Sequence, residues 1–252
     1  MLSALRSAEA GMTAGLGIQD ILANNIANAA TVGYKRDGYV VAGFQATLAG
    51  AVAGAPAASV GAAPSGARVY VAEAPTYLTE GPIVRTGGEL DAAIVGEGFF
   101  VVEADGGEGY TRAGNFMLDG QRQLVTPAGY PVLGQGGPVQ LPAGRVEFGD
   151  DGAVLVDGTE VDVLRIVTFQ DESALTKDGS GVLRAGPRAR PVEGAEEVGT
   201  VRQYCLEQSN VSAVREMVDM ISAFRYYEAN AKALQSADHI LDKAVNELGR
   251  NS

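Results

Sequence analysis

Residue types that carry out nucleophilic, acid–base or metal chemistry are scarce in this 252-residue chain. The only cysteine is Cys205 and the only histidine is His239, so a cysteine metal clamp lacks its second ligand. We expect His239 to be an exposed or interfacial side chain of a helix, and Cys205 to act as a small apolar residue before that helix. No acid/base constellation is recognisable, which argues against an enzyme.

Two groups of glycine and acidic residues have a superficial likeness to ligand-binding loops. Gly96-Glu97-Gly98 lacks the strand–loop–helix order of a dinucleotide-binding fingerprint, so it predicts a tight turn. Asp150-Asp151-Gly152 and Asp157-Gly158 could mimic calcium loops, but their spacing fits hairpin turns. We therefore expect no metal, no cofactor and no small-molecule substrate.

Three asparagines gather near the end of a predicted N-terminal helix: Asn24, Asn25 and Asn28. Asn24 and Asn28 are four residues apart and share a helical face, so their amides could bond across a contact between subunits. The same residues could instead cap the helix end and form the following turn, which needs no partner. The sequence leaves both interpretations open.

These residues are positioned by two terminal helices, of which the first is predicted from Ser3 to about Asn28, with Gly33 as the stop beyond it. Alanine and glycine fill much of this segment, which weakens intrinsic helicity but lets a neighbouring backbone approach closely. Its imperfect apolar stripe consists of Leu5, Ala8, Met12, Leu16, Ile18, Leu22 and Ile26.

The second helix is predicted from Val211 to Leu248, with Ser209 or Asn210 as its N-cap. Two apolar registers with heptad spacing predict a coiled-coil seam: Met217, Phe224, Ala231, Asp238 and Val245 in one, and Met220, Tyr227, Leu234, Leu241 and Leu248 in the other.

A seam needs a partner, which is the N-terminal helix of the same chain or the same helices of neighbouring copies. We expect that neither terminal stripe buries itself fully against one partner. Asp238 either specifies the register of the seam or faces water or a basic neighbour such as Lys243.

Between the helices, glycine-rich sequence predicts β structure. Residues 45–67 form a low-complexity arm with almost nothing bulky to bury, and residues 178–200 read as a loop. Strand signals begin near Val69. They recur at Ile94–Val95, Phe99–Val102, Asn115–Leu118, Gln123–Thr126, Val132–Leu133, Arg145–Phe148, Ala153–Val156 and Val161–Phe169, with Asp-Gly turns at 105, 119, 151 and 157.

The predicted fold class is therefore α+β. A discontinuous domain of N- and C-terminal coiled-coil helices brackets a central antiparallel β-rich domain, built as a sandwich or open barrel. The predicted divisions are an N-terminal helix at 1–34, an extended arm at 35–68, the β-rich domain at 69–206 and the C-terminal helix at 207–252.

Charge and hydropathy argue against a nucleic-acid partner and against a membrane-spanning segment. The net charge of −12 argues against nucleic acid, because phosphate binding needs clustered lysine and arginine. No apolar run reaches membrane-spanning length. The first residues lack the continuous apolar core of a cleavable secretory signal, so we expect any export to use another route.

The motifs of the chain resemble those of the bacterial flagellar basal-body rod proteins and related axial proteins. The resemblance covers both ends and most of the middle. It is carried by Ala23–Arg36, which contains Asn-Asn-Ile-Ala-Asn and Gly-Tyr-Lys-Arg, by Leu90-Asp91 with Gly96–Val102, by Tyr110–Phe116, by Gln123–Thr126, by Glu207–Val211, by Glu216–Ile221 and by Tyr227–Lys232.

The resemblance implies a non-enzymatic subunit of a tubular rod that spans the periplasm and transmits torque from the motor to the hook. Its implied partners are further copies of itself, other rod proteins and the flagellum's own export apparatus, which delivers subunits without a cleaved signal peptide. The assembly interface is expected at Leu5, Met12, Leu16, Leu22, Asn24, Asn25, Ile26, Asn28, Met217, Met220, Phe224, Tyr227, Leu234, Leu241, Val245 and Leu248.

Alternatives remain at this point. Residues 129–138 and Val167–Phe169 look more like the proximal-rod paralogue, whereas the arm at 45–67 lies where the distal-rod protein carries an extra stretch. A secreted adhesin with a coiled-coil stalk and an enzyme that clears cell wall from the path of the rod are the competing functions.

Overall fold

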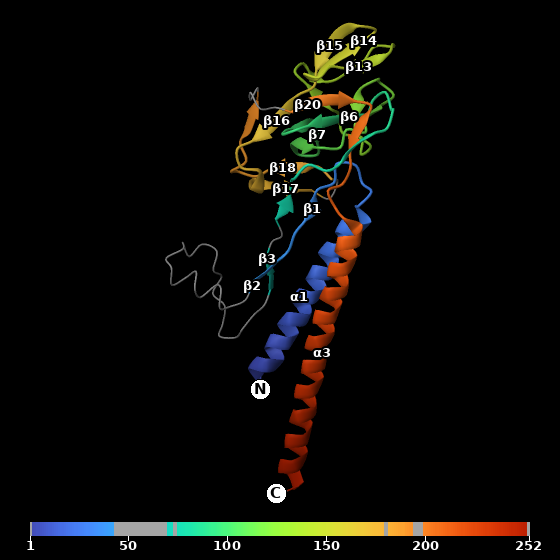
Figure 1. The fold of residues 1–252 in the computed structure, drawn as a ribbon. Coiled ribbons are helices and arrows are strands. Elements are labelled where there is room, and N and C mark those ends of the chain that lie inside the picture. The colour runs from blue at the N-terminus through green and yellow to red at the C-terminus, as the bar shows by residue number, and fades with distance from the viewer. Residues whose placement is uncertain (1, 43–69, 73–74, 179–180, 194–198, 251–252) are drawn as a thin grey trace. The chain divides into compact units, whose positions relative to one another are not determined.

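The computed structural model describes residues 2–42, 70–72, 75–178, 181–193 and 199–250 (Figure 1). The predicted arm at 45–67 lies outside this part of the chain. The chain divides into two compact units. We call residues 1–27, 37–75 and 212–252 the helical unit, and residues 28–36 and 76–211 the β-body. Residues 28–36 thus group with the β-body rather than with the helix that precedes them.

The described part of the helical unit consists of two long helices and one small strand pair. Helix α1 (Leu2–Ala27) packs against helix α3 (Ala213–Arg250), and β2 (Val40–Ala42) pairs antiparallel with β3 (Tyr70–Ala72). The expected N-caps of α3 are wrong, because the helix begins two residues later than predicted. Ser209 Oγ instead accepts a hydrogen bond from the backbone N–H of Val211 at 3.2 Å. Neither described helix carries an apolar run able to cross a membrane.

The β-body is built from short antiparallel strands, preceded by β1 (Arg36–Asp37) at the boundary of the two units. Its further elements are β4 (Thr76–Tyr77), β5 (Ile83–Arg85), β6 (Ala92–Val95), β7 (Phe99–Ala104), β8 (Gly107–Thr111), β9 (Met117–Leu118), β10 (Leu124–Val125), β11 (Leu133–Gly134), β12 (Gly137–Pro138), β13 (Val146–Phe148), β14 (Ala153–Val156), β15 (Thr159–Val163), β16 (Ile166–Phe169), the 3₁₀ turn η2 (Glu172–Ala174), β17 (Leu175–Lys177), β18 (Leu183–Ala185), β19 (Pro191–Glu193), β20 (Thr200–Gln203) and β21 (Cys205–Glu207).

The largest sheet has six strands in the order β17-β18-β8-β7-β16-β19. Strand β7 lies inside it and is covered on both faces, because side chains alternate along a strand. Phe100 and Val102 belong to a large core that also includes β13 and β14, whereas Phe99 and Val101 belong to a second core with Tyr110. The predicted α+β class, with a central antiparallel β-rich region between terminal helices, is confirmed.

The predicted turns at Asp157-Gly158 and at Gly96–Gly98 are confirmed. Asp157 and Gly158 both have positive φ, as a two-residue type I′ hairpin between β14 and β15 requires. Gly96 and Gly98 also have positive φ and form the turn between β6 and β7. Gly96–Gly98 thus joins two strands and not a strand and a helix.

One strand prediction and one loop prediction were wrong. The run Val161–Phe169 divides into β15 and β16. Between them, the backbone N–H of Leu164 donates to the carbonyl of Gly152, and that of Arg165 donates to the carbonyl of Leu133. The expected loop at 178–200 contains β18, β19 and the start of β20. Strand β18 pairs with β17 and β8, and β19 pairs with β16 through Pro191 at the sheet edge.

Candidate assembly interface

Helices α1 and α3 form an antiparallel seam inside one chain (Figure 1). Asn25 bonds to Glu216, and the backbone at Gly15 and Gly11 lies against Tyr227 and Asn230 respectively. The two residue numbers of each of these pairs add up to 241 or 242, so one continuous register describes the whole contact.

Small residues on α1 make this close approach possible. A Cβ atom added at Gly11 would lie 2.7 Å from the amide oxygen of Asn230, and one added at Gly15 would lie 3.4 Å from Cβ of Tyr227. Seven described residues of α1 are buried. Six of them recur at alternating spacings of three and four, namely Ala8, Gly11, Gly15, Ile18, Leu22 and Asn25, and the seventh is Ala14 beside Gly15. This is the spacing of a coiled-coil seam.

Only one of the two predicted registers of α3 faces α1. Met220, Tyr227 and Leu234 are half-buried, as expected for seam positions. Met217 and Phe224, from the other register, are 51% and 52% exposed. Ala223 and Asn230 take the companion positions instead: Ala223 packs with Ile18 and Leu22, and Asn230 lies against Gly11.

The remaining interface candidates are distributed over several environments. Leu22 is buried, Met12 and Ile26 are half-buried, and Leu16 is 49% exposed. The side chains of Leu5, Asp238, Leu241, Val245 and Leu248 lie outside the described set. The expected exposure of His239 is confirmed, and Cys205 lies partly buried in β21.

An apolar stripe remains uncovered at the start of α3. Its members, which gather on one side of the helix, are Val214 (74% exposed), Met217, Val218, Ile221 and Phe224. At 100° per residue the stripe is centred about 130° around the helix from the seam. We call these five residues the apolar stripe.

Helix α3 is also longer than its partner, with 38 residues against 26. In the register of the seam, the first residue of α1 falls opposite residue 239 or 240. Residues 240–250, which we call the overhang, therefore have no α1 residue opposite them in the same chain, and Figure 1 shows α3 continuing past the N-terminus. Ile240 at its start is 54% exposed.

A buried polar contact lies at the other end of the seam, where α1 ends and α3 begins. The fully buried Asn25 amide donates to the backbone C=O of Asp37 at 2.8 Å and to Glu216 Oε2 at 3.0 Å, and its oxygen accepts from the Asp37 N–H at 3.0 Å. Glu216 lies in the first turn of α3, where the helix dipole favours an anion.

The three asparagines have different environments in the structure. Asn28 Oδ1 accepts a hydrogen bond from the Thr31 hydroxyl, which supports its role in the turn after the helix. Asn24 is exposed. The structurally central residue is Asn25, which sequence reasoning grouped with its neighbours. Its partner Glu216 was missed, because nothing local marks that glutamate as buried.

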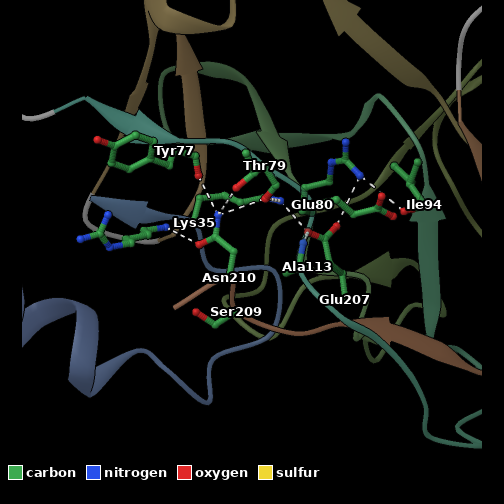
Figure 2. A network of polar contacts seen from close by, with 12 residues as sticks. Lys35, Tyr77, Thr79, Glu80, Ile94, Ala113, Glu207, Ser209 and Asn210 are labelled. Carbon is green, nitrogen blue, oxygen red and sulfur yellow. Dashed lines mark hydrogen bonds and ion pairs between the residues drawn. The ribbon is translucent and has the colours of Figure 1, made fainter. Parts of the chain in front are cut away.

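The β-body contains a second buried polar network, shown in Figure 2. The Glu207 carboxylate is fully buried and accepts hydrogen bonds from three groups: Lys35 Nζ at 2.5 Å, the backbone N–H of Gly81 at 2.8 Å, and the Arg112 guanidinium at 3.3 Å. Burial lowers the pKa of Lys35, and the adjacent Glu207 carboxylate opposes that shift.

Asn210 extends this network along the same chain segment. Its side-chain oxygen accepts from the Arg36 N–H at 2.7 Å, and its amide donates to the carbonyls of Tyr77 and Thr79 at 2.9 and 3.0 Å (Figure 2). The network therefore links residues 33–36 to residues 207–210, which lie at the end of β21 and just after it.

Gly33 allows this segment to lie close to the body. Its φ is +66°, and a Cβ atom there would lie 2.4 Å from the backbone N of Ala113. The Gly33–Arg36 and Glu207–Asn210 motifs were recognised in the sequence, but nothing in their local pattern indicates that they contact each other. Among the described residues, no group of three or more His, Cys, Asp or Glu side chains is placed to hold a metal ion.

Three family models match separate parts of the chain. Residues 5–35 match "Flagella basal body rod protein", residues 93–156 match "Flagellar hook protein FlgE/F/G D1 domain", and residues 202–247 match "Flagellar basal body rod FlgEFG protein C-terminal".

Curated relatives match nearly the whole chain. The flagellar basal-body rod protein FlgF of Caulobacter vibrioides is 37% identical over 92% of this chain and 91% of its own length. The FlgG protein of the same organism is 34% identical over 98% of this chain and 99% of its own length. FlgG of Bacillus subtilis is 33% identical over 98% and 99%.

The fold and its paired terminal helices define a class of structural protein in which a β-body is carried on a discontinuous helical unit. Together with these matches, they identify the family: the chain belongs to the flagellar basal-body rod proteins. It is a structural subunit of the rod, located in the flagellar basal body.

Proposed function

We propose that this chain polymerises through its helical unit into the tubular rod and transmits torque along it. The observation that carries the proposal is the apolar stripe of α3, which stays exposed after α1 and α3 have paired. Burial of each such side chain contributes on the order of 1.5–3 kcal/mol, and a contact repeated in many copies makes the assembly rigid.

The distribution of charge between the two units supports assembly through the helical unit. The helical unit holds 7 Lys and Arg against 10 Asp and Glu, a net charge of −3. The β-body holds 12 against 21, a net charge of −9. Near-neutral helices can approach other copies closely, whereas the acidic β-bodies keep free chains apart.

Within the family we propose the proximal rod as the location. The support is the higher identity to FlgF than to FlgG within Caulobacter vibrioides, 37% against 34%, together with the motifs at 129–138 and 167–169. The distal rod is the alternative, favoured by the position of the arm at 45–67. Labelling the chain and locating it along the axis of imaged basal bodies distinguishes the two.

We further propose that the chain acts without catalysis, and that its partners are its own copies, other rod proteins and the flagellar export apparatus. The support is the family membership. Cells that lack the export apparatus should fail to place this chain in basal bodies, and its arrival there in such cells would contradict this route.

Substitution Leu234→Asp tests the assembly function. It places a charge at a half-buried seam position, where an unpaired buried charge costs several kcal/mol. Cells with this chain should lack rods, while the purified protein keeps a folded β-body. The matched control is Gln235→Asp, at an exposed position one residue further on. Normal rods and motility in Leu234→Asp cells would refute the proposal.

A further inference from the structure

Two parts of α3 lie outside the internal seam, at opposite ends of the helix. The apolar stripe spans residues 214–224, and the overhang spans residues 240–250. Each covers eleven residues, or about 16 Å of helix. Inside one chain they cannot meet, because α3 is a single continuous helix.

The apolar spacing of the overhang matches that of the stripe. Leu241, Val245 and Leu248 follow one another at intervals of four and three residues. Met217, Ile221 and Phe224 have the same intervals. A shift of 24 residues places the two triplets in the same order, so they can form one parallel seam between two copies of α3.

We propose that the overhang of one copy docks in parallel on the apolar stripe of the next copy, with Leu241 beside Met217, Val245 beside Ile221 and Leu248 beside Phe224. This inference rests on the proposed polymerisation and names the surfaces that carry it. The occupant of the stripe is thus a second copy of this chain.

Continuity with the internal seam supports this occupant. The overhang begins where α1 ends, so it prolongs a helix surface that is already in a coiled coil. Because the two contacting surfaces differ, the contact is heterologous and does not close on itself. Copies translated by 24 residues of helix, about 36 Å along α3, would continue without limit.

Mixing two blocked variants tests the proposal. The double variant Ile221→Asp, Phe224→Asp loses the stripe, and a chain that ends after His239 loses the overhang. Each alone should stay monomeric under conditions in which the unmodified chain polymerises, with at least about a tenfold rise in the concentration needed for assembly. Mixed, they should form a 1:1 dimer and stop there, as measured by sedimentation velocity.

Val161→Asp is the matched control, because Val161 is an exposed apolar residue of the β-body (40% exposed). It should polymerise like the unmodified chain. If the truncated chain still dimerises alone, the stripes pair with each other and the head-to-tail contact is overturned. If the unmodified chain polymerises but the mixture gives no heterodimer, this contact is again overturned while the proposed function stands. If the folded unmodified chain never assembles, the proposed function itself fails.

Disulfide trapping provides a second readout that does not depend on loss of assembly. In a Cys205→Ala background, cysteines at Ile221 and Val245 of one chain should give a ladder of linked multimers when assembled protein is oxidised. Moving the first cysteine from Ile221 to Ser222 turns it by 100° around the helix, so the ladder should largely disappear. Equal ladders from both pairs would overturn the proposed register.

Discussion

The helical unit and the β-body differ in how far they bury their apolar side chains. In the β-body, Phe99 and Phe100 are neighbours on β7 that enter two different buried cores. In the helical unit, Phe224 and four further stripe residues stay at the surface after the helices have paired. The two cores of the β-body are therefore buried within one chain, whereas the apolar stripe of the helical unit can be covered only by another molecule. This difference is what a polymerising subunit requires.

Polar burial differs between the two units as well. The β-body encloses a carboxylate between two cations, with Glu207 held by Lys35 and Arg112. In the helical unit, the buried Glu216 accepts a hydrogen bond from the amide of Asn25. Removing the Glu207 charge would therefore leave two buried cations without their anion.

Glu207→Gln should have the largest effect. It leaves Lys35 and Arg112 buried without their carboxylate, and breaking a buried pair in this way costs about 3–5 kcal/mol. Denaturant unfolding of the β-body, followed by tyrosine fluorescence, measures the loss. Glu147→Gln is the control, because its side chain is 48% exposed and its contact with Arg145 is at the surface. Equal stability of the two variants would mean that the buried cluster contributes little.

Gly33→Ala should cost the β-body about 2–4 kcal/mol, since it adds both left-handed backbone strain and a clash with Ala113. Gly87→Ala is a matched control. Gly87 also has positive φ, at +81°, but a Cβ atom there meets nothing within 4 Å. The difference between the two variants isolates the close approach, and it should vanish if the segment at 33–36 does not pack against the body.

Gly11→Leu should weaken the helix pair by about 1–3 kcal/mol, because the new side chain has to displace Asn230 from α3. Thr13→Leu places the same side chain at an exposed position of α1 and should be nearly neutral. Amide hydrogen exchange along α1 reports the effect. Unchanged protection in Gly11→Leu would contradict the internal seam.

Glu172→Gln should have the smallest effect and the opposite sign. Burial, and then the nearby Glu97 carboxylate, raise the pKa of Glu172 above 4.5. A raised pKa means that the folded chain binds this proton more tightly than the unfolded chain. The resulting stabilisation is therefore present below pH 4.5 and is lost as the pH rises through the folded-state pKa.

The substitution to glutamine removes the charged form, so it should raise stability at neutral pH by less than about 1 kcal/mol. Below pH 4.5 it should match the unmodified chain. Thermal unfolding at the two pH values measures this, with the exposed Glu160→Gln as the control. A gain that persists unchanged in acid would exclude the ionisation of Glu172 as its cause.

The sequence by itself determined the two terminal helices, the strands of the β7 core, the Asp-Gly turns and the family. These features depend on local period and on the backbone needs of single residues, such as the positive φ at Gly158. Each can be read within a window of a few residues, because the physical cause acts over that same window.

Only the tertiary structure decided which side of α3 meets α1. Both registers of the helix are apolar in sequence, and Met220 rather than Met217 packs against Ile18 and Leu22 of α1. The same holds for the strands within 178–200 and for the contact of Lys35 with Glu207, which are 172 residues apart in the chain. Such contacts depend on surfaces that come together only after folding, and no local pattern encodes them.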